Sequence, residues 1–145
     1  MRLVVQRVKK AACKVDEKIT GEINQGFMIL VGIKNTDTKE EVLRLAKKVS
    51  KLRIFEDNQG KMNLDIHEVN GEILSISQFT LYGDAKKGNR PSFTEAMSGD
   101  FAKEYYLYFN ECLRNEGLVV KEGIFGADMQ IELINDGPVT IIMEA

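Results

Sequence analysis

The sequence predicts an α+β fold in which a curved, mostly antiparallel sheet or partial β-barrel carries two main helices packed on its outside. Three observations lead to this prediction. Two segments repeat apolar residues at the 3.6-residue spacing of amphipathic helices, whereas seven or eight shorter segments are β-rich. Many of the β-rich segments are separated by turns short enough for hairpins, so the chain does not resemble a repeated βαβ protein. No repeat, low-complexity tract or linker interrupts the pattern, and residues 1–145 are therefore expected to form a single domain.

Three β-rich segments precede the first helix. Val4, Val5 and Val8 open the first of them, and residues 18–26 (KITGEINQG) look like a hairpin. Residues 27–33 (FMILVGI) are continuously apolar, which predicts a buried strand.

The first helix is expected over residues 37–52. Asp37 and Glu40 have the spacing of a capping box, and the apolar residues that follow recur on one helical face. A further strand is predicted to begin at residues 53–56 and to end in the turn sequence DNQG at 57–60.

The middle of the chain predicts a long strand, a polar loop and the second helix. Gly71 introduces residues 72–82 (EILSISQFTLY), which we expect to form one strand. A polar loop follows at 83–93. Residues 98–115 have helical spacing of aromatic and aliphatic residues, interpreted as core, and Gly117 provides the stop.

The C-terminal region is predicted to be β again, over residues 118–125, 129–134 and 139–143. The last two segments are separated by Asp136-Gly137, a strong hairpin signal between apolar runs. The next residue is Pro138, which has no N–H group for a sheet ladder and is normally excluded from strand interiors. Pro138 is one of only two prolines in the chain.

Composition excludes several classes of protein. The formal net charge is −2, which argues against tight non-specific binding of nucleic acid, although one local basic patch remains compatible with it. No apolar run approaches the ~20 residues of a membrane span, and the N-terminal residues do not resemble a signal peptide. Cys13 and Cys112 are too few for a disulfide framework and are expected to be buried free thiols of a cytoplasmic protein, with a redox or metal pair as the alternative.

Common catalytic motifs are missing. The one histidine, His67, lies in a turn-rich stretch, and it would have to serve any Ser-His-Asp triad, but such a residue is more typical of an exposed loop. No Cys/His spacing suits zinc and no glycine-rich phosphate loop is present, so we expect neither a metal nor another cofactor. The sequence offers no strong general base.

Two stretches have a composition that is unusual for plain scaffold. One is SQFTL (77–81), in which Ser77, Gln78 and Thr80 end an otherwise apolar strand. The other is NDGPVT (135–140), which contains Gly137 and Pro138. From the pattern alone, we interpret SQFTL as a half-exposed strand edge and NDGPVT as a turn stiffened by Pro138.

Two groups of basic residues stand out from the acidic background. One is Lys86, Lys87 and Arg90 in the polar loop. The other is Lys47, Lys48, Lys51 and Arg53 around the end of the first helix. Taken alone, each is interpreted as a solvated loop or helix face.

Taken together, SQFTL and NDGPVT resemble the two signature motifs of the D-aminoacyl-tRNA deacylases, proofreading enzymes of the cytosol. The initial VVQRV, the loop KKGNRPSF (86–93) and the late GIFGADM (123–129) also match that family, in register and over essentially the whole chain. The resemblance implies hydrolysis of the ester that joins a D-amino acid, or glycine mischarged on tRNA(Ala), to the terminal adenosine of tRNA. An aminoacyl ester is already activated, so its hydrolysis depends more on positioning and oxyanion stabilisation than on a powerful base.

The family resemblance also implies a homodimer with active sites at the subunit interface. In the family, each site is completed by the Gly-Pro motif of the partner subunit, so Gly137 and Pro138 are expected to reach across the interface with a cis peptide bond. Main-chain carbonyls held there would bind the substrate's amino group and exclude an L side chain, whatever the side chain's identity.

The remaining site residues are also assigned by resemblance. Thr80 is either a nucleophile or, as we favour, an orienting group while the ribose 2′-hydroxyl of the tRNA assists and main-chain N–H groups near Phe79 stabilise the oxyanion. Ser77 and Gln78 are expected to form the pocket, and Phe79 and Met129 to flank the adenine or the reacting centre. The further residues expected to bind substrate are Phe125, Ala127 and Asn135, and those expected to contact tRNA phosphates are Lys86, Lys87 and Arg90.

Two alternatives to an esterase are retained. One is a non-catalytic nucleic-acid-binding module on the same fold, which the net acidic charge disfavours. The other is a structural dimer in which the motif residues serve packing alone.

Overall fold

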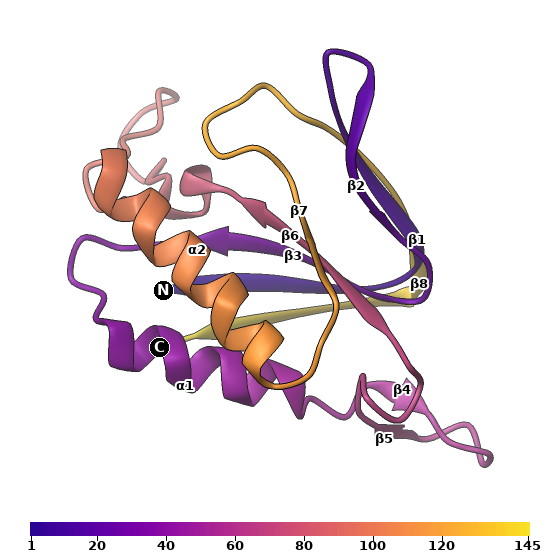
Figure 1. Ribbon diagram of the computed structural model, residues 1–145. Coiled ribbons are helices and arrows are strands. Elements are labelled where there is room, and N and C mark those ends of the chain that lie inside the picture. Colours follow the sequence, from indigo (N-terminus) through magenta and orange to yellow (C-terminus); the bar gives the residue numbers. More distant parts are fainter.

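Eight strands, two α-helices and one short 3-10 helix form the fold in the computed structural model, which describes residues 1–145 (Figure 1). In chain order these elements are β1 (Arg2–Val15), β2 (Lys18–Ile23), β3 (Gly26–Gly32), α1 (Lys39–Ser50), β4 (Phe55–Glu56), β5 (Met62–Leu64), β6 (Glu72–Ser77), the 3-10 helix η1 (Phe79–Tyr82), α2 (Gly99–Asn115), β7 (Val120–Glu122) and β8 (Gln130–Glu144).

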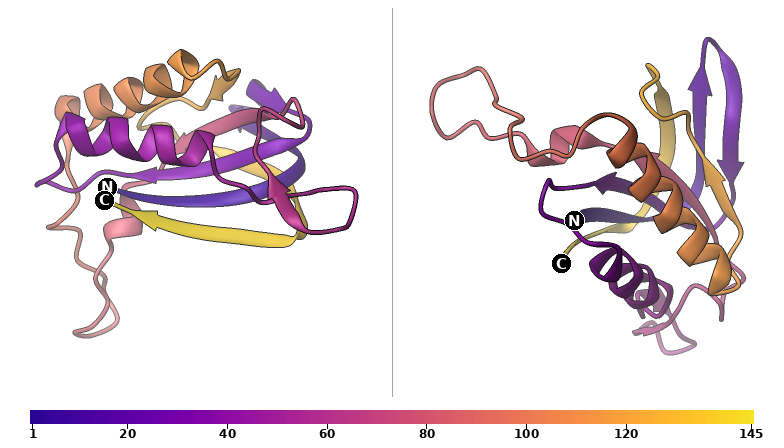
Figure 2. Two further views of the ribbon diagram at one scale, coloured as in Figure 1. Left: turned by 90° about the horizontal axis from the view of Figure 1, so that it is seen from below. Right: turned by 60° about the vertical axis from the view of Figure 1, so that its left-hand side comes forward.

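The long strand β1 organises the main sheet. Its first half pairs with β3 and its second half with β2, while β8 runs antiparallel along its other edge. The path continues from β3 to β6 and β7 through two parallel pairings. The sheet curves strongly and is nearly closed (Figure 2). The predicted α+β class is confirmed, and the sheet is mixed because the crossover through α1 makes β3 and β6 parallel.

Both α-helices lie side by side on one face of this sheet (Figures 1 and 2). The larger apolar core fills the space between them and the sheet. It contains Leu45 and Val49 of α1 and Phe109 of α2. Successive side chains of a strand point to opposite faces, so Phe27 joins this core and Met28 joins a smaller core on the other face. The predicted placement of two helices on the outside of a curved sheet is therefore confirmed.

The first helix begins two residues later than predicted, at Lys39, and its capping box was assigned to the wrong pair. Thr38 is the N-cap and forms the box with Glu41, not Asp37 with Glu40. Asp37 is buried, where its carboxylate accepts from the N–H of Lys34 at 2.6 Å and pairs with the N-terminal ammonium. Its side chain is thus directed away from the helix, and the next hydroxyl takes the capping position.

The predicted hairpin over residues 18–26 is also wrong. The hairpin instead joins β1 to β2 through Asp16 and Glu17, whose φ angles of 49° and 65° are those of a tight two-residue turn. Strands β2 and β3 do not pair with each other, since both use the same edge of β1.

At the C-terminus, Asp136-Gly137 does not reverse the chain. Strand β8 is continuous, and both of its halves pair with β1. Val8 of β1 lies opposite Asn135 and Gln6 lies opposite Thr140, so residues 136–139 bulge out opposite Arg7 alone. A bulge in one long strand therefore replaces the predicted hairpin between two strands.

Two expectations from composition were tested by the structure. Cys13 and Cys112 are buried and free, as predicted. None of the helices has the length and apolar character needed to cross a membrane.

Candidate active site

The SQFTL segment is a turn at the carboxyl end of β6, not the continuous strand predicted over 72–82. Pairing with β3 ends where Ser77 faces Val31, because β3 itself stops one residue later. The N–H of Gln78 still donates to the Val31 oxygen at 2.8 Å, and the chain then enters η1. Gly32 permits this change of direction, since a Cβ there would lie 3.0 Å from Cβ of Leu81. The sharp turn carries the motif side chains to the end of the sheet.

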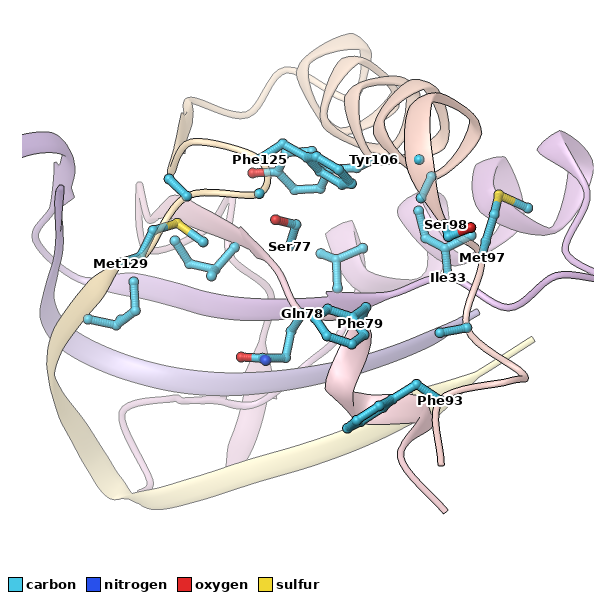
Figure 3. A pocket seen from close by; sticks show the side chains of 18 residues that line it. Ile33, Ser77, Gln78, Phe79, Phe93, Met97, Ser98, Tyr106, Phe125 and Met129 are labelled. Atoms are coloured by element: carbon cyan, nitrogen blue, oxygen red, sulfur yellow. The ribbon is translucent and has the colours of Figure 1, made fainter. Parts of the chain in front are cut away.

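A mostly apolar cavity of about 520 Å³ opens beside this turn (Figure 3). Six predicted site residues line it: Ser77, Gln78, Phe79, Phe125, Ala127 and Met129. Sequence reasoning missed Phe93, Met97 and Ser98, which lie in the loop before α2, and Tyr106, which it assigned to the core. Helical spacing had placed Tyr106 on the buried face of α2 correctly, but not at a cavity.

Two aromatic pairs bound the cavity, and Ser77 lies between them (Figure 3). Phe79 and Phe93 are in edge-to-face contact, with ring centroids 5.1 Å apart, and Phe79 is 56% exposed. Tyr106 and Phe125 form the other pair, with centroids 5.9 Å apart. Exposed aromatic rings at a cavity provide surfaces on which a planar ring can stack.

Tyr106 is fixed at the buried side of the cavity. Its hydroxyl donates to the main-chain oxygen of Ser75 at 2.7 Å, two residues before Ser77. Burial raises the pKa of the Tyr106 phenol, so the group stays protonated and able to donate. Tyr106 thereby ties α2 to the strand end from which the SQFTL segment departs.

Thr80 has no neighbouring base. Its side chain is exposed and does not line the cavity, and its hydroxyl accepts a hydrogen bond from the amide of Gln78. His67 Nε2 lies 2.8 Å from the oxygen of Glu116, beyond the C-terminal end of α2, whereas Ser98 and Gly99 at the opposite end line the cavity. A nucleophilic triad built on His67 is therefore excluded by position.

The main-chain N–H groups of Phe79 and Thr80 have no acceptor within the chain. They open η1, so no preceding turn of that helix offers them a carbonyl, and neither donates elsewhere in the protein. Of the two residues only Phe79 lines the cavity, and a free N–H group at a cavity is the usual means of binding a developing oxyanion.

The NDGPVT motif lies outside this chain's own cavity. Gly137 and Pro138 are exposed at the tip of the β8 bulge, and the peptide bond between them is cis, as predicted. The Asn135 side chain accepts from the N–H of Val139 at 2.9 Å and so closes the bulge on itself. Beneath it, the buried Arg7 donates to the oxygen of Asp136 at 3.1 Å and to that of Ile54 at 2.7 Å. None of residues 135–138 is among the cavity-lining residues.

The loop with Lys86, Lys87 and Arg90 projects from the body of the molecule (Figure 2). All three side chains are exposed, and none forms an ion pair. The chain returns from this loop to Phe93 at the cavity, so the basic loop adjoins the site. No group of three or more His, Cys, Asp or Glu side chains is arranged to hold a metal ion.

A family model described as D-Tyr-tRNA(Tyr) deacylase matches residues 4–144. This chain belongs to that family. Among curated deacylase-family relatives, the D-aminoacyl-tRNA deacylase of Exiguobacterium sp. strain AT1b is 56% identical, over 99% of this chain and 98% of its own length. The protein of the same name from Bacillus pumilus is 54% identical, over 100% of this chain and 99% of its own length.

Two solved structures have a similar fold. The c-Myc DNA unwinding element binding protein superposes with a TM-score of 0.93 at 41% identity, covering 100% of this chain and 99% of its own. A probable eukaryotic D-amino acid tRNA deacylase superposes with a TM-score of 0.82 at 18% identity, covering 98% and 97%, and this likeness shows the shared fold alone.

Proposed function

We propose that this chain hydrolyses the ester between a D-amino acid and the 3′-terminal ribose of tRNA. Water adds to the ester carbonyl, the carbon–oxygen bond to the ribose breaks, and free amino acid and tRNA are released. Family membership and the shared name of the relatives support the reaction. The observation that carries the proposal is the cavity at the SQFTL turn, which combines the free main-chain N–H of Phe79 with a lining in which Tyr106 is the only titratable side chain.

For the chemical step, we assign oxyanion stabilisation to the N–H groups of Phe79 and Thr80. A threonine nucleophile needs a base to accept its proton, and the only side chain bonded to the Thr80 hydroxyl is the Gln78 amide. The ribose 2′-hydroxyl lies next to the scissile ester and is the nearest group able to assist. Thr80 and Gln78 then orient the substrate, and Phe79 stacks with the terminal adenine.

For chiral selection, we propose that the bulge of one subunit completes the pocket of the other in a homodimer. Two observations support this arrangement. Gly137 and Pro138 are exposed yet absent from their own chain's cavity. Strand β8, which carries them, is an edge strand whose Ile142 is 66% exposed, as expected of a surface that another subunit covers.

In this arrangement, main-chain carbonyls at Gly137 and Pro138 bind the substrate's amino group and occupy the space of an L side chain. Asn135 supports the bulge from within the same chain. Because the selector is backbone, D-amino acids of many kinds are accepted, and so is glycine, including glycine mischarged on tRNA(Ala).

The rest of the tRNA is held electrostatically. Lys86, Lys87 and Arg90 are free of ion pairs beside the cavity, and we assign them to phosphates of the acceptor stem. We place the activity in the cytoplasm, in accord with the two buried free thiols.

A second candidate function is non-catalytic binding of nucleic acid, favoured by the similarity to a protein named for binding a DNA unwinding element. One experiment separates the two. The purified protein is incubated with D-Tyr-tRNA and L-Tyr-tRNA, and loss of each ester is followed. Selective loss of the D ester supports the deacylase. If the protein binds tRNA but cleaves neither ester, the binding module is supported.

A further inference from the structure

The exposed face of α1 is a stripe of positive charge. Arg44, Lys47, Lys48 and Lys51 follow one another at i, i+3, i+4 and i+7, the spacing that places side chains on one helical face. All four are exposed, and the buried residues of α1 occupy the opposite face. Between Glu41 and Glu56 the chain has no acidic residue at all.

None of these four cations forms an ion pair, although six other basic side chains in the protein do. Two basic residues in the last turn are accounted for by the helix dipole, which favours cations there. A row of four is not, because like charges at i, i+3 and i, i+4 repel each other in the free protein. Such a row is stabilised when it meets an anionic partner.

The stripe leads to the β8 bulge. Arg53 continues it beyond the helix, with its Nε donating to the oxygen of Asn63 at 2.8 Å. The next residue is Ile54. The guanidinium of Arg7 donates to the main-chain oxygen of Ile54 at 2.7 Å and to that of Asp136 at 3.1 Å. The Arg7 side chain therefore connects the end of the stripe with the bulge that contains Gly137 and Pro138. In Figure 1 the chain leaves the C-terminal end of α1 toward β4 and β5.

We propose that Arg44, Lys47, Lys48, Lys51 and Arg53, here called the α1 stripe, bind the sugar-phosphate backbone of the tRNA whose aminoacyl end lies in the partner subunit's pocket. This inference rests on the proposed function, since the bulge of one subunit must adjoin the pocket of the other. From Arg44 to Lys51 the helix rises about 10 Å, which corresponds to about three phosphates of one strand in a duplex. The projecting 83–93 loop of one subunit and the α1 stripe of the partner subunit thus bind the same tRNA.

The test compares two variants that each lose four positive charges. The stripe variant is R44Q/K47Q/K48Q/K51Q, and the matched control is K9Q/K10Q/K18Q/K121Q, whose lysines are exposed and free of ion pairs. Two substrates are used: D-Tyr-tRNA and the 3′-O-D-tyrosyl ester of adenosine, which has no phosphate. Binding of uncharged tRNA and of duplex DNA is measured over a range of salt concentrations.

We expect the stripe variant to lose about tenfold or more in the ratio of kcat/KM for the tRNA ester to that for the adenosine ester. Its tRNA affinity should depend less steeply on salt, by about 2 to 3 in the log–log slope. An equal loss in both variants would show a net-charge effect and overturn the proposal, as would an unchanged slope. Loss of DNA binding with tRNA binding retained would assign the stripe to DNA. If the wild type cleaves neither ester, the proposed function fails, and the tRNA affinities still decide whether the stripe binds tRNA.

Discussion

Arg7 holds Asp136 from beneath the β8 bulge, through a hydrogen bond of 3.1 Å from its Nε to the Asp136 main-chain oxygen. The same guanidinium donates to the oxygen of Ile54 at 2.7 Å, and both contacts are buried or partly buried. Gly137 leaves room for this arrangement, since a Cβ there would lie 3.1 Å from Arg7 Nη2 and its φ of +126° disfavours any side chain. One side chain thus positions the exposed tip of the NDGPVT motif.

Replacing Arg7 should therefore damage both stability and activity. Arg7→Ala leaves two carbonyls without a donor and is expected to lower the free energy of unfolding by about 2–3 kcal/mol. Arg7→Lys keeps the charge but lacks the planar fork that spans both oxygens. We therefore expect a large loss of deacylation rate with a smaller loss of the free energy of unfolding. Urea unfolding and the D-Tyr-tRNA assay are measured on both variants. Full activity in Arg7→Lys would show that the contact with Asp136 does not position the bulge.

Phe79 is expected to contribute to binding of the terminal adenosine. Stacking of a base on an aromatic ring contributes about 1–3 kcal/mol, so Phe79→Ala should raise KM by about tenfold to a hundredfold. Phe79→Leu keeps apolar contact but no ring face, and its effect should be intermediate. A matched control is Phe101→Ala, because Phe101 is 72% exposed and does not line the cavity. Equal KM values for Phe79→Ala and the control would remove Phe79 from the binding surface.

Thr80 distinguishes the two chemical mechanisms. If the 2′-hydroxyl assists and Thr80 only orients groups, Thr80→Ala should lower kcat by less than about tenfold, well below the roughly 10²–10⁴-fold that a general acid or base contributes. Single-turnover deacylation of D-Tyr-tRNA gives the chemical rate directly. A loss of several orders of magnitude with tRNA affinity retained would make Thr80 the nucleophile.

Tyr106 gives the fold a defined response to alkaline pH. Burial raises the pKa of its phenol above the ordinary value of 10.0, so the folded state keeps a proton that the unfolded chain releases. The contribution of the protonated phenol to the free energy of unfolding is complete below pH 10 and is lost as the pH rises through the folded-state pKa. Tyr106→Phe should lower stability by about 1 kcal/mol at pH 7, through the lost bond to Ser75, and should make the alkaline fall shallower.

Urea unfolding of Tyr106→Phe and wild type at pH 7 and pH 11 measures both effects. The fall should not vanish, because burial also raises the pKa of Tyr82 to about 12. Tyr82→Phe is therefore the companion variant. A Tyr106→Phe protein that loses as much stability as wild type on going to pH 11 would contradict the assignment.

Periodicity in the sequence was sufficient to predict the elements but not their connections. The apolar spacing of residues 98–115 matched α2 to within one residue, and the continuous apolar run at 27–33 became β3. Asp136-Gly137 led to the wrong prediction of a hairpin, because a bulge and a hairpin use the same turn residues. Only the pairing of both halves of β8 with β1 distinguishes them, and that pairing is a long-range property.

The site was predictable where the family motifs carry it and not elsewhere. Ser77, Gln78 and Phe79 line the cavity as expected, whereas Phe93 and Met97 come from an irregular loop whose position no periodicity specifies. Thr80 was expected in the same pocket, but the turn into η1 directs its side chain to solvent. Residues 135–138 have no place in their own chain's cavity, so their contribution depends on a second subunit.

That dependence leads to a prediction about mixed dimers. Phe79→Ala impairs the pocket, and Gly137→Ala impairs the bulge, because its Cβ would lie 2.9 Å from Val139 Cγ2. If each pocket is completed by the other subunit's bulge, a mixed dimer has one doubly impaired site and one intact site. Mixing the two variants under conditions of subunit exchange should then restore about a quarter of wild-type sites, since about half of the dimers are mixed.

The control is a mixture of the double variant F79A/G137A with wild type, which forms no intact site in its mixed dimers if pocket and bulge come from different subunits. If they come from the same chain, each wild-type subunit keeps its own site, and activity in the control should stay proportional to the wild-type share. The same arrangement would give no recovery in the mixture of single variants. Recovery in the first mixture, together with a less than proportional activity in the second, is the result that a site shared between subunits requires.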